Sequence, residues 1–418
     1  MIYALGTLGS GRVCAAVAAG WRFWRGTRVR DRVAVLRRPR KRPPGAGTVD
    51  SCEEANLDPA LYFSSSYEQA REKFLKVARE KTAEITSYEH ELKGARGEDL
   101  AIDTAWLGPR DASKVFVSSS GTHGVEGFMG SAVQVGALGL GHYDSLPDST
   151  ALLFVHAVNP WGFSWLRRVN EDGVDLNRNF IDFTMPTPSR ELFDELVEGT
   201  LLPKTLGFYG TLKADLSLLR AKLKYGEERL KLAIACGQYD HPLAPMYGGA
   251  KPSWSNQTLR TIIRENLTRA STVAVIDYHT GIGDYATGEI IGMARPGSAA
   301  HIQEQDCFGD RYLSLFDEDT VAYDATGVIP GAYYEELPDT NVLWGFHEFG
   351  TLSKIAVFKA LRADHCLHAY GDPKSKKGLA ISMKLKDAFY CDKDHWRAEV
   401  LRLSFETESA VMRFFAAS

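Results

Sequence analysis

The sequence has few cysteines and contains no Cys-x-x-Cys pair. Six of its 418 residues are cysteine, and they are scattered along the chain: Cys14, Cys52, Cys236, Cys307, Cys366 and Cys391. This distribution excludes a disulfide-rich scaffold and argues against a cysteine-ligated zinc site. It also favours a reducing compartment, so we expect a mitochondrial or cytoplasmic location.

Long apolar runs and the serine-hydrolase motif are missing as well. The longest apolar stretch near the start, VCAAVAAGW at residues 13–21, is too short to span a bilayer and is followed by Arg22 and Arg25. No G-x-S-x-G turn occurs, which argues against a serine hydrolase. We therefore expect neither a membrane span nor a catalytic serine.

Positive charge is scarce outside the N-terminus. Residues 1–50 hold 11 of the 49 Lys and Arg but only two of the 53 Asp and Glu, which leaves the remainder of the chain near −13. An acidic body lacks the basic face that phosphates require, so we expect no nucleic-acid partner. The Arg-rich extension, residues 1–50, suits an organellar transit peptide better than a secretory signal, and a disordered arm is the alternative. Residues 51–418 are expected to form one large domain.

Four short apolar runs indicate the fold class. They are KVFVSS (114–119), ALLFVHAV (151–158), TVAVIDYH (272–279) and VLWGFHEF (342–349). Segments with helical spacing lie between them, including residues 211–235 and 256–267, and an amphipathic helix is expected over 66–85. We predict an α/β fold with a mixed, mostly parallel central sheet covered by helices.

Each of the four runs is followed by, or ends in, residues that can do chemistry. The first leads into SSGTHGVEGF with His123 and Glu126, the second into NPWGF, the third ends at His279, and the fourth reaches Glu348. In open α/β sheets ligands bind beyond the carboxyl ends of the strands. We therefore expect these side chains to meet in one crevice.

Two histidines and a glutamate form one of the standard zinc ligand sets, with a fourth position left for water. The H-x-x-E turn of His123 and Glu126 supplies two ligands and His279 the third. The motif alone is weak, because HIQE at residues 301–304 has the same spacing. That second copy follows no predicted strand, and we interpret it as a solvated helix face.

The segment NPWGFSWLRRVNEDGVDLNRNF, residues 159–180, completes a series of five motifs. In this order they resemble the zinc carboxypeptidase superfamily, whose signature is H-x-x-E, N-P-x-G-F, an arginine, D-x-N-R-N-[FW], and a distant histidine and glutamate. The resemblance is stronger to a branch of that superfamily with HGVEGF, VDLNRNF, DYHTG and EFGT motifs. It covers about residues 62–418 and implies a carboxypeptidase-like α/β fold with one catalytic zinc ion per chain.

The resemblance also implies roles for the matched residues. Asn177 and Arg178 would hold a free carboxylate, since a guanidinium binds a carboxylate bidentately. The alternative is a structural role, in which Asn177 is an N-cap and Arg178 a surface arginine. Asp175 would support the first zinc histidine or merely cap a helix. Arg168, or Arg167 beside it, would stabilise a developing oxyanion. Glu348 would be the general base, unless it is a buried structural glutamate.

The expected reaction is hydrolysis of an amide bond next to a free C-terminal carboxylate, which makes a peptide the first substrate to consider. The carboxypeptidases also use a tyrosine that closes over the substrate, and Tyr333 and Tyr334 are candidates for it by chain order only. The aspartoacylase and succinylglutamate desuccinylase relatives share several motifs, so an N-acyl amino acid substrate is the alternative. A non-catalytic binding module is the third reading.

Overall fold

A computed structural model of the protein describes residues 58–418 except 188–189, 206, 318–319 and 321–324. Residues Asp58–Ser418 form one compact unit. The expected N-terminal extension, residues 1–50, lies outside the described residues, and so does Cys52.

The centre of this unit is an eight-stranded sheet in the order β1-β2-β4-β3-β5-β8-β6-β7. Its strands are β1 (Glu84–Lys93), β2 (Asp99–Leu107), β3 (Lys114–Ser120), β4 (Thr150–His156), β5 (Thr272–Tyr285), β6 (Gly288–Gly292), β7 (Tyr312–Ser314) and β8 (Asn341–Gly350). The strands β4, β3, β5 and β8 are parallel neighbours, whereas β1, β2 and β6 pair antiparallel with their neighbours nearer the centre. The predicted α/β fold with a mixed, mostly parallel sheet is confirmed.

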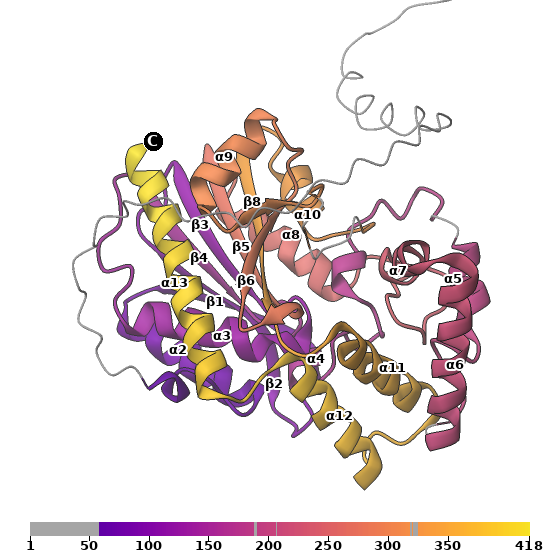
Figure 1. The fold of residues 1–418 in the computed structure, drawn as a ribbon. Helices are drawn as coiled ribbons and strands as arrows, with labels where there is room; N and C mark the ends of the chain where they lie inside the picture. The colour runs from indigo at the N-terminus through magenta and orange to yellow at the C-terminus, as the bar shows by residue number, and fades with distance from the viewer. Residues whose placement is uncertain (1–57, 188–189, 206, 318–319, 321–324) are drawn as a thin grey trace, which may run out of the picture. The chain divides into compact units, whose positions relative to one another are not determined.

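Helices cover both faces of the sheet (Figure 1). The α-helices are α2 (Tyr67–Glu80), α3 (Gly127–Gly139), α4 (Pro160–Ser164), α5 (Glu191–Val197), α6 (Phe208–Tyr225), α7 (Glu227–Ala235), α8 (Trp254–Asn266), α9 (Ala299–Phe308), α10 (Pro330–Glu336), α11 (Lys354–Tyr370), α12 (Lys376–Phe389) and α13 (Asp394–Ala417). Short 3-10 turns are η1 (Pro59–Leu61), η2 (Gly124–Glu126) and η3 (Leu176–Arg178). No helix among the described residues is both long and apolar enough to cross a membrane.

The two core layers follow from the alternation of side chains along each strand. On β3, Phe116 packs with α2, α3 and α13 on one face, while Val115 and Val117 pack with α8 and α10 on the other. Successive side chains of a strand point to opposite faces, so a strand buried on both sides is apolar throughout. This is why the four predicted runs are continuous apolar stretches.

The predicted helical segment at residues 211–235 is two helices. Gly226 has φ +82° and ψ 157°, so the chain leaves the helical conformation there and α7 starts at the next residue. Glycine adopts this conformation without the steric cost that a side chain would add. The break belongs to the segment between η3 and α8, which stands to one side of the sheet (Figure 1).

The interpretation of residues 301–304 as a solvated helix face is wrong for the glutamate. Glu304 lies on α9 but is buried, and its Oε2 accepts a hydrogen bond from the Tyr312 hydroxyl at 2.5 Å. Its Oε1 accepts the backbone N–H of Trp344 at 3.2 Å. Glu304 therefore ties α9 to the sheet edge, and a motif spacing alone could not show this burial.

Candidate active site

His123, Glu126 and His279 come together beyond the carboxyl end of β3, where His279 follows the last residue of β5 that pairs with β3. Glu126 Oε1 lies 2.9 Å from His123 Nδ1, and Glu126 Oε2 lies 3.2 Å from His279 Nδ1. The two Nδ1 atoms are 3.2 Å apart, and all three residues are buried. Among the described residues this is the group of three that could hold a metal ion.

Glycines allow this convergence. A Cβ on Gly124 would meet the Gly162 backbone carbon at 2.1 Å, so the turn after β3 presses directly on α4. Asn159 caps that helix by accepting the Gly162 N–H at 2.8 Å, and the Arg168 carbonyl accepts the Gly124 N–H at 3.2 Å. The NPWGF motif therefore forms the support under the His123 turn.

An aspartate lies behind each histidine. Asp175 Oδ1 is 3.1 Å from His123 Nε2, and Asp277 Oδ2 is 2.7 Å from His279 Nε2. A carboxylate at Nε2 favours the tautomer with its proton there, which leaves the Nδ1 lone pair facing the centre. Two such lone pairs and a carboxylate oxygen match the His₂Glu donor set of a catalytic zinc site.

Asp277 is not among the residues predicted from the sequence. It lies two positions before His279 on β5. Residues two positions apart on a strand point to the same face of the sheet, so the two side chains are neighbours. Its Oδ1 also accepts hydrogen bonds from Ser119 at 2.8 Å and from Thr122 at 3.0 Å, so its position is fixed by three partners. The pattern Asp-x-His at the end of a predicted strand was the available signal.

The buried charges act on each other. Burial alone would raise the pKa of Glu126, but His123 and His279 hold that pKa well below its usual range. Burial lowers the pKa of His279, but Asp277 and Glu126 more than reverse the effect, so the pKa of His279 is well above its usual value. Without a metal ion these contacts favour the ionised form of Glu126 and the protonated form of His279.

Glu348 lies opposite His279 in the β5–β8 register and is partly buried. Its Oε1 accepts the backbone N–H of Ile282 at 2.9 Å. Burial, and next the negative charge of Glu126, raise the pKa of Glu348 to about 8. The neighbouring His347 is buried on the other face, where its ring centroid is 4.2 Å from that of Phe349.

The two adjacent arginines go to different places. Arg168 pairs with Asp175 Oδ2, and its Nε is 3.9 Å from Glu126 Oε1. Arg167 instead donates two hydrogen bonds to Asp364 on α11, at 2.9 and 3.0 Å, in a buried ion pair. Of the two candidates, Arg168 is the one at the His–Glu–His cluster.

Asn177 and Arg178 lie in η3, directly after Asp175. Arg178 is 7% exposed and donates from Nε and Nη2 to the Ala235 carbonyl, at 3.2 and 2.8 Å. It makes no ion pair with any described residue, and burial lowers its pKa. Asn177 Oδ1 accepts the Ile329 N–H at 2.9 Å. A buried guanidinium without an acidic partner is costly unless an anion joins it.

Neither candidate tyrosine is brought to the cluster. Tyr333 is 1% exposed and packs on Trp344 in the core, with ring centroids 5.2 Å apart. Tyr334 lies on α10 and is 41% exposed.

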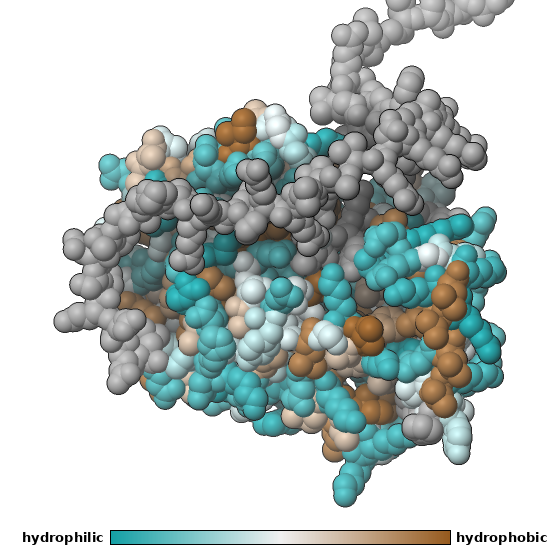
Figure 2. Space-filling view, in the orientation of Figure 1, coloured by the Kyte–Doolittle hydropathy of each residue, from teal (hydrophilic) through white to brown (hydrophobic). Residues whose placement is uncertain are grey.

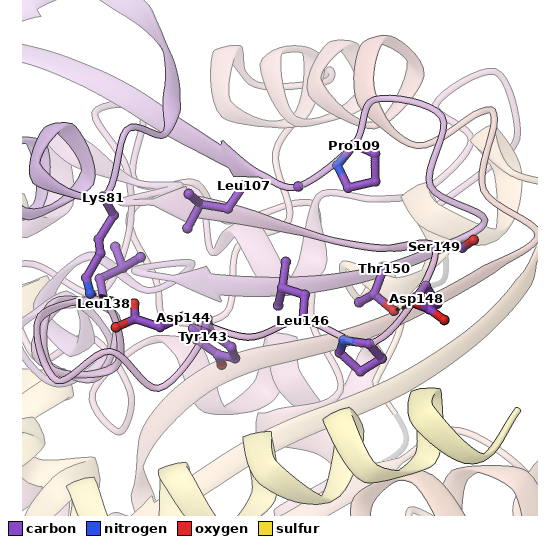
Figure 3. A pocket seen from close by; sticks show the side chains of 12 residues that line it. Lys81, Leu107, Pro109, Leu138, Tyr143, Asp144, Leu146, Asp148, Ser149 and Thr150 are labelled. Carbon is purple, nitrogen blue, oxygen red and sulfur yellow. Dashed lines mark hydrogen bonds and ion pairs between the residues drawn. The ribbon is translucent and has the colours of Figure 1, made fainter.

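A cavity of about 550 Å³ lies away from these residues (Figure 3). It is lined where β2 ends and β4 begins, by residues that include Leu107, Tyr143 and Thr150. Because β4 runs parallel to β3, the first residues of β4 lie at the opposite end of the strands from His123, which follows the last residue of β3. None of the candidate site residues lines this cavity.

A family model described as "Protein of unknown function (DUF2817)" matches residues 63–403. The chain belongs to this family. No curated protein sequence matches it significantly.

Several solved structures are similar to the chain at low identity. Bovine thrombin-activatable fibrinolysis inhibitor, in complex with tick carboxypeptidase inhibitor, is 10% identical, with 85% of this chain and 99% of that chain covered and a TM-score of 0.47. Carboxypeptidase A from Helicoverpa armigera is 14% identical, with coverages of 77% and 73% and a TM-score of 0.41. Succinylglutamate desuccinylase from Chromobacterium violaceum is 15% identical, with coverages of 75% and 76% and a TM-score of 0.34. At these identities and TM-scores the similarity carries no argument about activity, so the function has to be inferred from the side chains of this chain.

Proposed function

We propose that the protein is a zinc-dependent hydrolase that cleaves an amide bond next to a free carboxylate, as a metallocarboxypeptidase does. The observation that carries the proposal is the meeting of His123, Glu126 and His279 through two Nδ1 atoms and a carboxylate, with Glu348 beside them. Metal ligands and a nearby carboxylate of raised pKa are the parts that water activation requires.

Zinc bound by these three residues would supply Lewis acidity that makes water more acidic near neutral pH. Glu348 is then the group that takes the proton of the attacking water and passes it to the leaving nitrogen. Arg168, partly exposed beside Glu126, offers its remaining N–H groups to the oxygen that becomes negative during attack. The backbone N–H of Ile282 orients the Glu348 carboxylate for this transfer.

Arg178 and Asn177 supply the preference for a free carboxylate. The guanidinium uses three N–H groups on backbone carbonyls, those of Ala235 and Asn177, and two remain for a ligand. Because Arg178 is buried without an acidic partner, a substrate carboxylate would complete its pairing. This supports an exo-acting hydrolase rather than an endopeptidase.

An N-acyl amino acid amidohydrolase is the second candidate. It is favoured by the positions of Tyr333 and Tyr334, since neither reaches the cluster to close over a peptide. Both substrate classes carry the free carboxylate that Arg178 would bind. They differ in the length of the acyl side, which is what an assay has to vary.

The test is an assay of the zinc-loaded full-length protein against three substrate sets: free-acid peptides, the same peptides with amidated C-termini, and N-acyl amino acids. Products are identified by mass spectrometry. We expect cleavage of one free-acid set and nearly inert amides, because amidation removes a charge-assisted contact worth roughly 2–5 kcal/mol. Equal rates on free and amidated peptides would refute the carboxylate clamp and the exo-acting function together.

A further inference from the structure

Helix α6 carries a row of exposed leucines on its outer face. Leu212, Leu216, Leu219 and Leu223 are 45%, 47%, 52% and 79% exposed. Their spacing of four, three and four residues places them along one side of the helix. Figure 2 shows this side as a continuous hydrophobic stripe at the edge of the described unit.

The opposite side of α6 packs against the rest of the protein. Ala214 and Ala221 are buried, and Leu218 packs against the cluster formed with α5, α7 and α11. The helix is therefore attached to the protein without its leucine row. Four large apolar side chains in one row on the outside of a folded domain mark an interaction surface.

The charged residues beside the leucine row indicate which kind of partner the surface would bind. At about 100° per residue, Lys213, Arg220 and Lys224 flank the leucines on one side and Lys222 on the other. All four are exposed. Lys222 pairs with Glu227 and Lys224 with Glu195, whereas Lys213 and Arg220 form no ion pair with a described residue. The acidic residue of the helix, Asp215, lies on the same flank as Lys222 and pairs with Lys359 and Arg362 of α11.

This arrangement disfavours a second copy of the chain. In an antiparallel helix pair the Lys213 and Arg220 flanks would face each other, and in a parallel pair the one acidic flank residue, Asp215, is already occupied. Like charges along the seam are destabilising. A leucine row flanked by Lys and Arg is instead the pattern of a helix that lies in the interface of an anionic bilayer.

We propose that α6 docks this protein on a membrane surface rich in anionic phospholipids, with its axis in the membrane plane. The leucine row enters the boundary between headgroups and acyl chains, and Lys213 and Arg220 contact the lipid phosphates and carboxylates. Lys and Arg stems cover apolar surface while their charged ends stay at the headgroups, which suits their positions beside the row. The proposal is independent of the hydrolytic site.

The experiment measures co-sedimentation of the full chain with vesicles of phosphatidylcholine alone and of phosphatidylcholine mixed with phosphatidylserine. We expect binding to the mixed vesicles that weakens with added salt, as screened charges require. The affinity of the double variant Leu216→Glu/Leu223→Glu for the mixed vesicles should fall by about ten-fold or more. The variant Lys213→Glu/Arg220→Glu should lose the preference for phosphatidylserine.

The matched control is Leu92→Glu/Leu140→Glu, which changes two other leucines of 46% and 43% exposure and should bind like the wild type. Circular dichroism and thermal unfolding check that each variant is folded. Equal binding by the Leu216/Leu223 variant and the wild type would overturn the proposal, since the basic N-terminal extension would then carry the binding. So would no vesicle binding at all, or a wild-type dimer that this variant converts to a monomer.

Discussion

The sharpest prediction concerns Asp277, which the structure places behind a metal ligand. Replacement by asparagine keeps the shape of the side chain and an oxygen that Ser119 and Thr122 can still reach. It removes the charge of the carboxylate whose Oδ2 lies 2.7 Å from His279 Nε2 and favours a proton on that nitrogen. The amide can turn an N–H towards Nε2, which moves the imidazole proton to Nδ1, the atom that faces Glu126. We therefore expect Asp277→Asn to weaken zinc binding.

The size of this effect follows from similar contacts in metal sites. Loss of a carboxylate behind a ligating histidine costs roughly 10- to 100-fold in metal affinity, or about 1.4–2.7 kcal/mol. Ser119→Ala is the matched control, because it removes one neutral hydrogen bond to the same carboxylate and keeps the charge. The loss there should stay within about five-fold, since such a bond contributes about 1 kcal/mol or less.

The assay is competition for zinc between the purified protein and a fluorescent chelator, with circular dichroism to check the fold of each variant. Wild-type affinity in a folded Asp277→Asn protein would refute the idea that this aspartate fixes the tautomer of His279. An equal loss in Ser119→Ala would show that packing of the strand, rather than charge, controls the ligand.

Three further predictions follow from the same geometry. Glu348→Gln should keep its zinc content by elemental analysis but lose roughly 10²-fold or more in kcat, because the proton acceptor is gone. Because Asp277 and Glu126 raise the pKa of His279, zinc has to displace a proton, so calorimetry in buffers of different ionisation enthalpy should detect proton release and weaker binding at lower pH. Burial raises the pKa of Glu408, a carboxyl bonded to the Tyr278 hydroxyl, from 4.5 to about 7, so its neutral form contributes stability that is complete below pH 4.5 and lost as pH rises through 7. Glu408→Gln should lack this component, worth about 3 kcal/mol, when thermal unfolding is compared at pH 5 and pH 8.

The parts of the fold that could be predicted are those where local pattern and burial agree. The four apolar runs are long enough, and buried enough on both faces, that no other element suits them. Parallel pairing then brings their carboxyl ends to one edge, which is why His123, His279 and Glu348 could be placed together before any coordinates. Strand β7 has three residues and carries no comparable pattern.

What could not be predicted depends on contacts between distant segments. Arg167 and Arg168 are chemically identical neighbours, and only the position of Asp364 on α11 decides which one leaves the site. Glu304 has the same spacing to a histidine as Glu126, yet it ends up between α9 and the sheet. In the sequence Asp277 has no feature that separates it from other strand residues, and its contact with His279 Nε2 is visible only in the structure.

The balance of buried charge gives a separate reason for a divalent cation at this edge of the sheet. Glu126, Asp175 and Asp277 are buried carboxylates in direct contact with the two histidines, and Arg168 is the one fixed cation that pairs with this set within the described residues. In the metal-free chain a proton on His279 offsets one more negative charge of this set, and the buried guanidinium of Arg178 acts on Asp175 without forming an ion pair. A divalent ion in place of the His279 proton would place more positive charge next to the carboxylates. It would also offset the charge of Glu126, which after burial is the second cause that raises the pKa of Glu348, so we expect the ion to lower that pKa.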